Sequence, residues 1–407
     1  MAVVLLLILA ACASPNGADG GTAEIEATNT VDAALAAAVS ELPAAADPAT
    51  SEPLPTPSLN PAVTAVMPTS ADVIHFAADD ERIRYIGRFD FQDPKRPRFD
   101  WSASTIEFAF DGTGLAIFLE DEYNLYNVTV DGRSEVLDTE AGQERYVIAE
   151  GLAPGEHFFR MVKRTEPIVG EAAFGGVEIT GEGLLTPPME AGRRIEFIGD
   201  SITTGFGNEG ESPECFFTAA TQNAEKTYAA MVAAELDADY SLIALSGLGV
   251  YYPLQAQGVS SSDTAIEFID RALAFEPEVT WPPEQQTPDA VVISLGTNDY
   301  SADPNPEDEA YIEVYLELLN AVRVRYPEAF VFAVAGPLVF GQGPEMIKTA
   351  VERFRAANGD ERAAYVFIED DLERSEVDFG CAWHPNVHGQ QKIAAQLTPA
   401  IAGHMGW

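Results

Sequence analysis

From residue 194 to the carboxyl terminus, short continuous apolar runs alternate with longer stretches of helical periodicity. The apolar runs lie at 194–199, 241–245, 290–295, 330–334 and 365–368. The helical patterns lie near 224–236, 263–274, 307–325, 344–357 and 388–402. Strands that are apolar on both faces and separated by helices predict a parallel, doubly wound α/β sheet. Ligands of such sheets bind beyond the carboxyl ends of the strands, so the residues that follow each strand are the candidates for chemistry.

Between about residues 73 and 187 the pattern changes to short runs in which apolar and polar residues alternate. These runs lie at 83–89, 105–110, 115–119, 126–130 and 157–162. Asp-Gly and Pro-Gly dipeptides, typical of turns, separate several of them. We therefore expect a small all-β domain, a sandwich or jelly roll, over 73–187, followed by the α/β domain over 188–407.

The first 72 residues show neither pattern. The apolar run from Val3 to Ala11 is too short to span a bilayer and is typical of a secretory signal. Leu-Ala-Ala-Cys, ending at Cys12, resembles the bacterial lipobox, although no Lys or Arg precedes the run. We expect cleavage before Cys12 and lipid attachment to its sulfur; the alternative is a plain signal peptide over 1–12. Residues 13–72 are rich in Ala, Pro and acidic residues, which favours a disordered linker.

The net charge of the chain disfavours some classes of binding partner. Asp and Glu number 65 against 23 Lys and Arg, a formal net charge of −42. Such a surface repels nucleic acid and anionic lipid, so we expect no nucleic-acid ligand and membrane contact only through the lipid anchor. We expect a monomer that works outside the cytoplasm, on the outer membrane or cell surface, or else in the periplasm or medium. Cys215 and Cys381 are a possible pair that their spacing does not settle.

Four strand or loop ends carry residues suited to acyl transfer. The first strand ends in Gly-Asp-Ser, which places Ser201 at the start of a helix, where partial positive charge gathers. Gly247 follows the second strand, and Asn298 follows the third. Their N–H groups, with that of Ser201, are a plausible oxyanion hole. His384, before the last helix, is positioned in sequence to accept the serine proton.

Neighbouring residues are candidates for holding the substrate. Trp383 precedes the histidine, and an indole there can stack on a sugar ring. Asp299 and Tyr300 follow Asn298 directly and are also expected at the substrate, although Tyr300 is equally suited to the core.

Gly-Asp-Ser-Ile, Ser-Gly, Gly-Thr-Asn-Asp and His-Pro-Asn, in this order, resemble the motifs of the SGNH (GDSL-type) hydrolases, which have a flavodoxin-like fold. The β domain ahead of them, the stretch 379–389 and Lys-Arg-Thr-Glu at 163–166 look more narrowly like carbohydrate esterase family 2. The resemblance covers roughly residues 75–405. It implies removal of O-acetyl groups from hemicellulose such as xylan or glucomannan, by serine-based double displacement without metal or cofactor. It also implies Ser201 as nucleophile and His384 as base.

One position departs from the SGNH pattern. These enzymes usually carry an aspartate two or three residues before the histidine, where this chain has Ala382 and Cys381. Some members of the esterase family are thought to use a main-chain carbonyl instead, which fixes the histidine tautomer without a full negative charge. Asp378 is the alternative partner, and loss of catalysis is a third possibility.

Other interpretations remain open. Residues 205–210 match G-x-G-x-x-G, but they begin after the helix start and lack an acidic ribose partner. His384 and His388 are four residues apart, as metal ligands on a helix can be, but Pro385 intervenes. An esterase for lipid or other short acyl esters would use the same residues. A glycan-binding lipoprotein without activity is the rival from another class.

Overall fold

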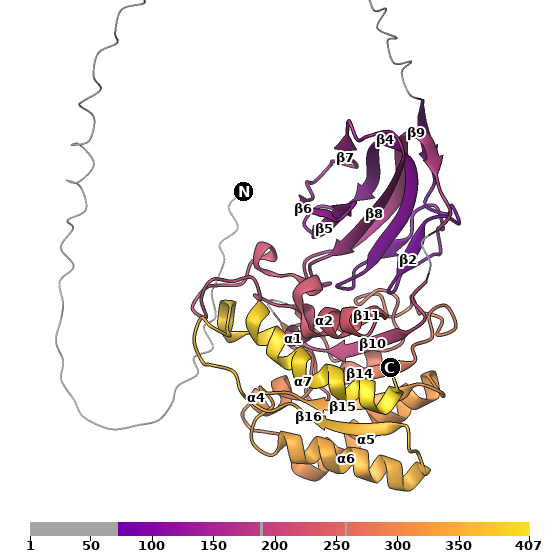
Figure 1. Ribbon diagram of the computed structural model, residues 1–407. Helices are drawn as coiled ribbons and strands as arrows, with labels where there is room; N and C mark the ends of the chain where they lie inside the picture. Colours follow the sequence, from indigo (N-terminus) through magenta and orange to yellow (C-terminus); the bar gives the residue numbers. More distant parts are fainter. Residues whose placement is uncertain (1–71, 188–189, 257–258) are drawn as a thin grey trace, which may run out of the picture. The chain divides into compact units, whose positions relative to one another are not determined.

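The computed structural model of the chain describes residues 72–187, 190–256 and 259–407 (Figure 1). The expected signal peptide, Cys12 and nearly all of the linker therefore lie outside the described residues. The described part contains two large sheets, an antiparallel one before residue 185 and a parallel one after residue 193, and a small two-stranded sheet. No helix among the described residues is long and apolar enough to cross a membrane.

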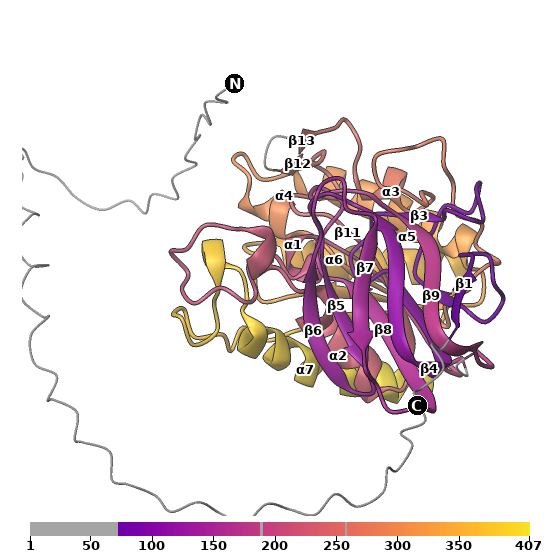
Figure 2. The same cartoon turned by 90° about the horizontal axis from the view of Figure 1, so that it is seen from above.

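The first sheet contains nine antiparallel strands in the order β1-β9-β4-β8-β5-β6, with β2 and β7 paired to β4 and β3 to β9 (Figure 2). Its strands are β1 (Val73–Phe76), β2 (Arg84–Ile86), β3 (Arg98–Phe99), β4 (Thr105–Glu120), β5 (Leu125–Val130), β6 (Arg133–Asp138), β7 (Arg145–Glu150), β8 (Glu156–Lys163) and β9 (Ala172–Leu184). Alternate residues of the long strand β4, such as Phe108 and Phe110, point into a core where Phe108 stacks on Phe159 at 4.6 Å. The expected all-β region is confirmed; its jelly-roll arrangement stays a prediction.

The second sheet has five parallel strands in the order β11-β10-β14-β15-β16. They are β10 (Arg194–Gly199), β11 (Asp239–Ala244), β14 (Ala290–Ser294), β15 (Phe330–Ala335) and β16 (Ala363–Phe367). This is the 2-1-3-4-5 order of doubly wound folds. The order reverses between β10 and its neighbours, so the crevice for a ligand lies beyond the carboxyl end of β10.

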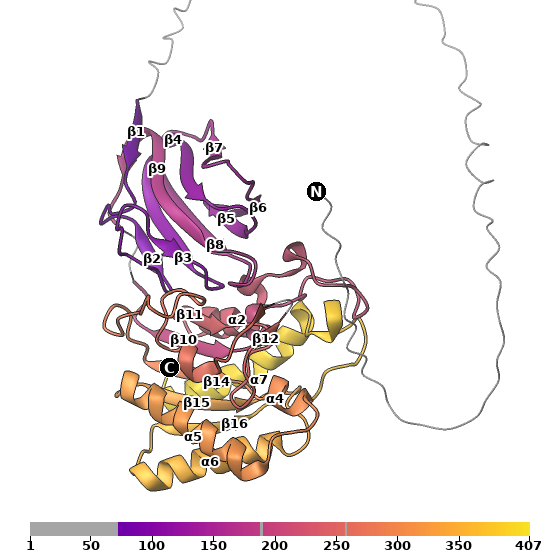
Figure 3. The ribbon, with the colours of Figure 1, turned by 180° about the vertical axis from the view of Figure 1, so that it is seen from behind.

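Helices cover both faces of the parallel sheet (Figure 3). The α-helices are α1 (Ser201–Thr204), α2 (Tyr228–Glu235), α3 (Ala265–Phe268), α4 (Thr297–Ser301), α5 (Asp308–Arg325), α6 (Gly343–Asn358) and α7 (Val387–Met405). Short elements complete the chain: η1 (Ala219–Thr221), η2 (Ala224–Lys226), η3 (Cys381–Trp383), and the hairpin strands β12 (Gln255–Ala256) and β13 (Val259–Ser260). Ile293 of β14 faces a core shared with α5 and α6, whereas Val292 faces the core under α2 and α7. This alternation explains why the strands are apolar on both sides.

The helix predicted over 263–274 is wrong in length, because α3 ends at Phe268. The carbonyl oxygens of Ile269 and Arg271 instead accept hydrogen bonds from the Arg88 guanidinium, both at 2.8 Å. Arg88 lies before the parallel sheet in sequence and is almost completely buried, where it also pairs with Glu196 of β10 at 3.0 Å. Hydrogen bonds from Arg88, which is distant in sequence, therefore take the place of hydrogen bonds within a further helical turn.

Candidate active site

Ser201 lies at the carboxyl end of the central strand. Strand β10 ends at Gly199, and Asp200 caps α1 by accepting a hydrogen bond from the Ile202 N–H at 3.0 Å. Gly199 is required here, since a Cβ atom would lie 2.0 Å from Oγ1 of Thr203. The cap and the glycine together place the Ser201 hydroxyl at the topological switch point of the sheet.

The structure brings His384 to this serine across 183 residues of sequence. Its Nε2 atom lies 2.8 Å from Oγ of Ser201, within hydrogen-bond distance. The imidazole also packs against the Phe206 ring, with a centroid separation of 4.5 Å. A proton can pass directly between hydroxyl and imidazole in this arrangement.

A main-chain carbonyl lies at the other ring nitrogen. Nδ1 of His384 is 3.0 Å from the carbonyl oxygen of Ala382. The backbone at Ala382 and Trp383 is left-handed, with φ of +53° and +59°, which is uncommon for residues with side chains. Asp378, the alternative partner, is fully buried elsewhere and binds Nδ1 of His388 at 2.5 Å and Nζ of Lys392 at 2.7 Å.

Burial determines the protonation state of His384. Desolvation lowers the pKa of its imidazole to about 4, and the carbonyl oxygens of Ala382 and Cys381 oppose this shift only in part. The imidazole is therefore neutral at pH 7. A neutral ring whose Nδ1 donates to a carbonyl has a free lone pair on Nε2, which is the form that accepts a proton from a hydroxyl.

A disulfide between Cys215 and Cys381 holds the histidine loop. The spacing of the cysteines had left this pairing open. Backbone hydrogen bonds support the same loop: Ala382 N–H donates to the Cys215 carbonyl at 3.0 Å, and Cys381 N–H donates to the Gly207 carbonyl at 3.0 Å. Gly380 N–H donates to the His384 carbonyl at 2.8 Å. The loop that presents His384 is thus tied to the segment after α1.

The three expected oxyanion donors lie on adjacent loops. The Asn298 side chain donates through Nδ2 to the Leu248 carbonyl at 2.8 Å, which leaves its second hydrogen free. Leu248 follows Gly247, whose φ of +82° and close approach to Gln255, with a built Cβ 2.1 Å from the Gln255 oxygen, exclude any side chain. Within the described residues, the N–H groups of Ser201 and Gly247 donate to no other protein atom. Ser201 and Asn298 also line the cleft described below, whereas Gly247, on the loop after β11, is not among the residues that line it.

A cleft of about 350 Å³ opens above the serine. Ser201, His384 and Asn298 line it, together with Trp383 and Phe340, each 47% exposed. Trp383 therefore lines the same cleft as Ser201 and His384, and its contact with a substrate stays a prediction.

Asp299 and Tyr300 do not line this cleft, which corrects the expectation that they contact substrate. Asp299 is fully buried and accepts hydrogen bonds from three consecutive N–H groups, of residues 250–252, at 2.9–3.0 Å. Tyr300 is 5% exposed and packs on Tyr311 with a centroid separation of 5.0 Å. Successive helical residues point about 100° apart, so when Asn298 faces the cleft the next two residues of α4 turn away from it.

The competing motif interpretations find no support in the geometry. Gly205 ends α1 in a left-handed conformation, and a Cβ at Gly207 would lie 2.8 Å from the Cys381 carbonyl oxygen, so these glycines serve packing. His388 is bound to Asp378 rather than aligned with His384. Within the described ranges no group of three or more His, Cys, Asp or Glu is placed to hold a metal ion.

Sequence reasoning missed some residues around the site. Phe340 and Arg374 line the cleft from segments without a recognisable motif. Glu166 accepts hydrogen bonds from the N–H and the hydroxyl of Ser246, the residue before Gly247, at 2.8 and 2.6 Å. The signal for Glu166 was the Lys-Arg-Thr-Glu run, which begins at the last residue of strand β8.

Comparison with known proteins supports this arrangement. A family model described as carbohydrate esterase 2 N-terminal matches residues 85–188, and one for the GDSL-like lipase/acylhydrolase family matches 197–392. Cellulase/esterase CelE of Acetivibrio thermocellus is 33% identical over 332 residues, which are 81% of this chain but only 40% of CelE. An acetylxylan esterase/glucomannan deacetylase of Cellvibrio japonicus is 28% identical over 321 residues, covering 76% of this chain and 86% of that protein.

A solved structure of a carbohydrate esterase is similar to this chain over most of its length. A family two carbohydrate esterase from Clostridium thermocellum in complex with cellohexaose is 33% identical, with a TM-score of 0.74, over 80% of this chain and 99% of that one. The two domain matches and this similarity, which spans nearly all of the solved chain, confirm the resemblance expected from the motifs. The chain therefore belongs to carbohydrate esterase family 2.

Proposed function

We propose that this protein removes O-acetyl groups from polysaccharides of the xylan and glucomannan type. The observation that carries the proposal is the 2.8 Å contact between Nε2 of His384 and Oγ of Ser201 at the floor of an open cleft. Names of relatives point the same way: one is an acetylxylan esterase/glucomannan deacetylase, and another was solved with cellohexaose bound. Trp383 offers an exposed indole beside the base, a suitable surface for a sugar ring.

The reaction proceeds by double displacement. Oγ of Ser201 attacks the acetyl carbonyl carbon while Nε2 of His384 takes the hydroxyl proton. The tetrahedral oxyanion receives hydrogen bonds from the N–H groups of Ser201 and Gly247 and from Nδ2 of Asn298, each worth about 3–4 kcal/mol of barrier. Collapse breaks the bond to the sugar oxygen, which takes the proton from His384. Water, deprotonated by the same imidazole, then attacks the acetyl-serine and releases acetate.

The Ala382 carbonyl replaces the usual carboxylate in this mechanism. By accepting the Nδ1 proton it keeps the neutral ring in the tautomer that presents a lone pair to Ser201. Its dipole also stabilises the imidazolium formed during attack, although less than a full negative charge would.

Acetate release tests the proposal. Wild-type protein should liberate acetate from acetylated xylan and glucomannan, and Ser201→Ala should reduce this by at least about 10⁴-fold. Equal, low acetate release from both proteins would make the proposal wrong. A strong preference for 4-nitrophenyl butyrate over the polysaccharides would instead favour an esterase for other acyl esters. Binding of the polysaccharide without acetate release would favour a glycan-binding lipoprotein.

The lipobox-like sequence supports a second part of the proposal, that the mature protein is anchored outside the cytoplasm through lipid on Cys12. Residues 13–72 would then tether the catalytic part to the membrane surface. Metabolic labelling with a radioactive fatty acid should mark the wild-type chain but not Cys12→Ala. Equal labelling of both chains would contradict the anchor.

A further inference from the structure

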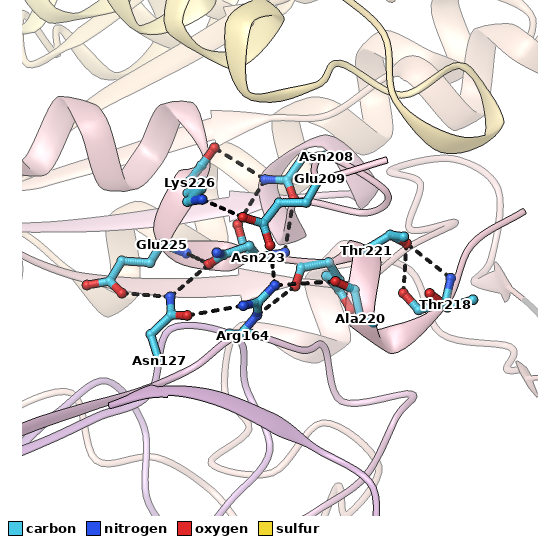
Figure 4. Close-up of polar contacts among 11 residues, drawn as sticks. Asn127, Arg164, Asn208, Glu209, Thr218, Ala220, Thr221, Asn223, Glu225 and Lys226 are labelled. Carbon is cyan, nitrogen blue, oxygen red and sulfur yellow. Dashed lines mark hydrogen bonds and ion pairs between the residues drawn. The ribbon is translucent and has the colours of Figure 1, made fainter. Parts of the chain in front are cut away.

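The segment after strand β8 lies against a loop of the parallel-sheet region. Figure 4 shows Arg164 at the centre of this contact, where its guanidinium pairs with Glu209 and donates to the carbonyl oxygen of residue 222 at 3.2 Å. Its own carbonyl accepts from the Ala224 N–H at 3.0 Å. Arg164 is 5% exposed, so these contacts are shielded from water. These contacts hold the segment after β8 against the loop at 220–224.

Two residues further on, Glu166 reaches the loop of the expected oxyanion hole. Its carboxylate accepts from the Ser246 N–H at 2.8 Å and from the Ser246 hydroxyl at 2.6 Å. Nε2 of Gln222 donates to the same carboxylate at 3.3 Å and to the Thr204 carbonyl of α1 at 3.3 Å. Glu166 thus links the residue before Gly247 with the helix that carries Ser201.

The burial of this carboxylate is costly. Glu166 is 2% exposed, and desolvation raises its pKa, which the hydrogen bonds from Ser246 and Gln222 oppose. Such a buried carboxylate is held in one position, since every shift would leave it unsatisfied. Two of its hydrogen bonds hold one residue, Ser246, through both its backbone and its side chain.

Gly247 depends on its neighbours for orientation. It lacks a side chain, and its φ of +82° is one of many conformations a glycine can adopt. Ser246 is held by Glu166 on one side of it, and the Leu248 carbonyl is held by Asn298 on the other. The segment 246–248, which carries the Gly247 N–H, is therefore held on both sides of the glycine.

We propose that Glu166 is a positioning residue of the oxyanion hole, which aims the Gly247 N–H through Ser246. The inference rests on the proposed esterase function and extends it. It also gives the amino-terminal β region a part in the chemical step, since Glu166 follows the last residue of β8 by three positions.

Kinetics of Glu166 variants with 4-nitrophenyl acetate test this inference. Glu166→Ala should lower kcat about 10- to 100-fold, somewhat less than loss of a whole donor, and leave KM within twofold. Glu166→Gln should keep more of kcat than Glu166→Ala, because its amide oxygen can accept from the Ser246 N–H and its amide nitrogen can donate to the Ser246 hydroxyl, although the hydrogen bond from Gln222 is lost. Glu225→Ala is the matched control: it removes contacts with Asn127 and Arg160 in the neighbouring network and should leave kcat unchanged.

A second readout separates positioning from a general loss of structure. Phosphorylation of Ser201 by diethyl 4-nitrophenyl phosphate forms an oxyanion at phosphorus, so its rate constant should fall in parallel with kcat. If Glu166→Ala folds, as judged by circular dichroism, and retains both rates within twofold, the inference is wrong. An unchanged kcat with a raised KM would also overturn it.

Ser246→Ala covers the case in which Glu166→Ala does not fold. It removes one of the two hydrogen bonds and should lower both rates about 3- to 10-fold, and unchanged rates would contradict the inference. These experiments also distinguish failure of the proposed function from failure of the proposed role of Glu166. If polysaccharide is not deacetylated but Ser201 still hydrolyses 4-nitrophenyl acetate, only the substrate proposal fails. If Ser201 reacts with neither 4-nitrophenyl acetate nor diethyl 4-nitrophenyl phosphate, both proposals are wrong.

Discussion

The carbonyl oxygen of Ala382 lies 3.0 Å from Nδ1 of His384. Two consecutive residues in left-handed conformations, Ala382 and Trp383, turn this carbonyl toward the ring. Each such residue costs on the order of 1–3 kcal/mol, a cost that the surrounding structure must offset. The disulfide at Cys381 and the hydrogen bond from Ala382 N–H to the Cys215 carbonyl hold the strained turn. No substitution removes the carbonyl itself, so its role is tested through the groups around it.

Asp378→Asn should leave turnover nearly intact. Because the carboxylate binds His388 and Lys392 rather than His384, kcat of the folded variant should stay within about fivefold of wild type. The free energy of unfolding should fall, since the buried side chain at 378 loses its ion pair with Lys392. Chemical denaturation and steady-state kinetics on the same sample check both. A fall in kcat of about 10⁴, the scale of a lost triad acid, would show that Asp378 acts on the base.

Removal of the disulfide should weaken both stability and turnover. The bridge closes a separation of 166 residues, so Cys215→Ala/Cys381→Ala should lower the free energy of unfolding by about 2–5 kcal/mol. Release of the Ala382 turn should also lower kcat more than it changes KM. Dithiothreitol serves as the control, because it should reproduce the loss in wild type and leave the double variant unaffected. Full activity of the reduced protein would contradict this role.

Asn298→Ala should affect the transition state rather than binding. It removes a side-chain donor that faces the cleft, so kcat should fall about 10²- to 10³-fold with little change in KM. Asn320→Ala is the matched control, since that amide on α5 only caps a carbonyl of its own helix. Comparable kcat values for the two variants would show that Asn298 does not donate to the oxyanion.

The pH profile should have an unusually low acid limb. His384 must be neutral to accept the Ser201 proton, and burial lowers its pKa to about 4. Activity should therefore persist as pH falls through 6.5, the ordinary range of histidine, and disappear as pH falls through about 4. The same shift means that the folded state binds fewer protons at this site than the unfolded state, so stability also declines below pH 6.5. Measurement of kcat/KM between pH 3 and 8 checks the limb; an inflection near 6.5 would contradict it.

Local patterns were sufficient for much of the fold. The apolar runs predicted the five parallel strands, because a strand buried on both faces needs an unbroken apolar segment. The motifs after those strands placed Ser201, Gly247 and Asn298 at one edge, since parallel strands end together, and the motif before the last helix added His384. Each strand and each motif is encoded by residues that lie close together in the chain.

Sequence patterns were thus sufficient to predict the sheet, the candidate nucleophile and the candidate base, whereas the contacts around them depend on the folded chain. Only the folded chain shows that Ala382 rather than Asp378 meets the base, that Asp299 turns inward, and that Glu166 holds a residue 80 positions away. Each depends on a backbone angle, a helical phase or a contact between distant segments. Periodicity records which face of an element is buried, whereas these choices arise only when several elements pack and compete for the same polar groups.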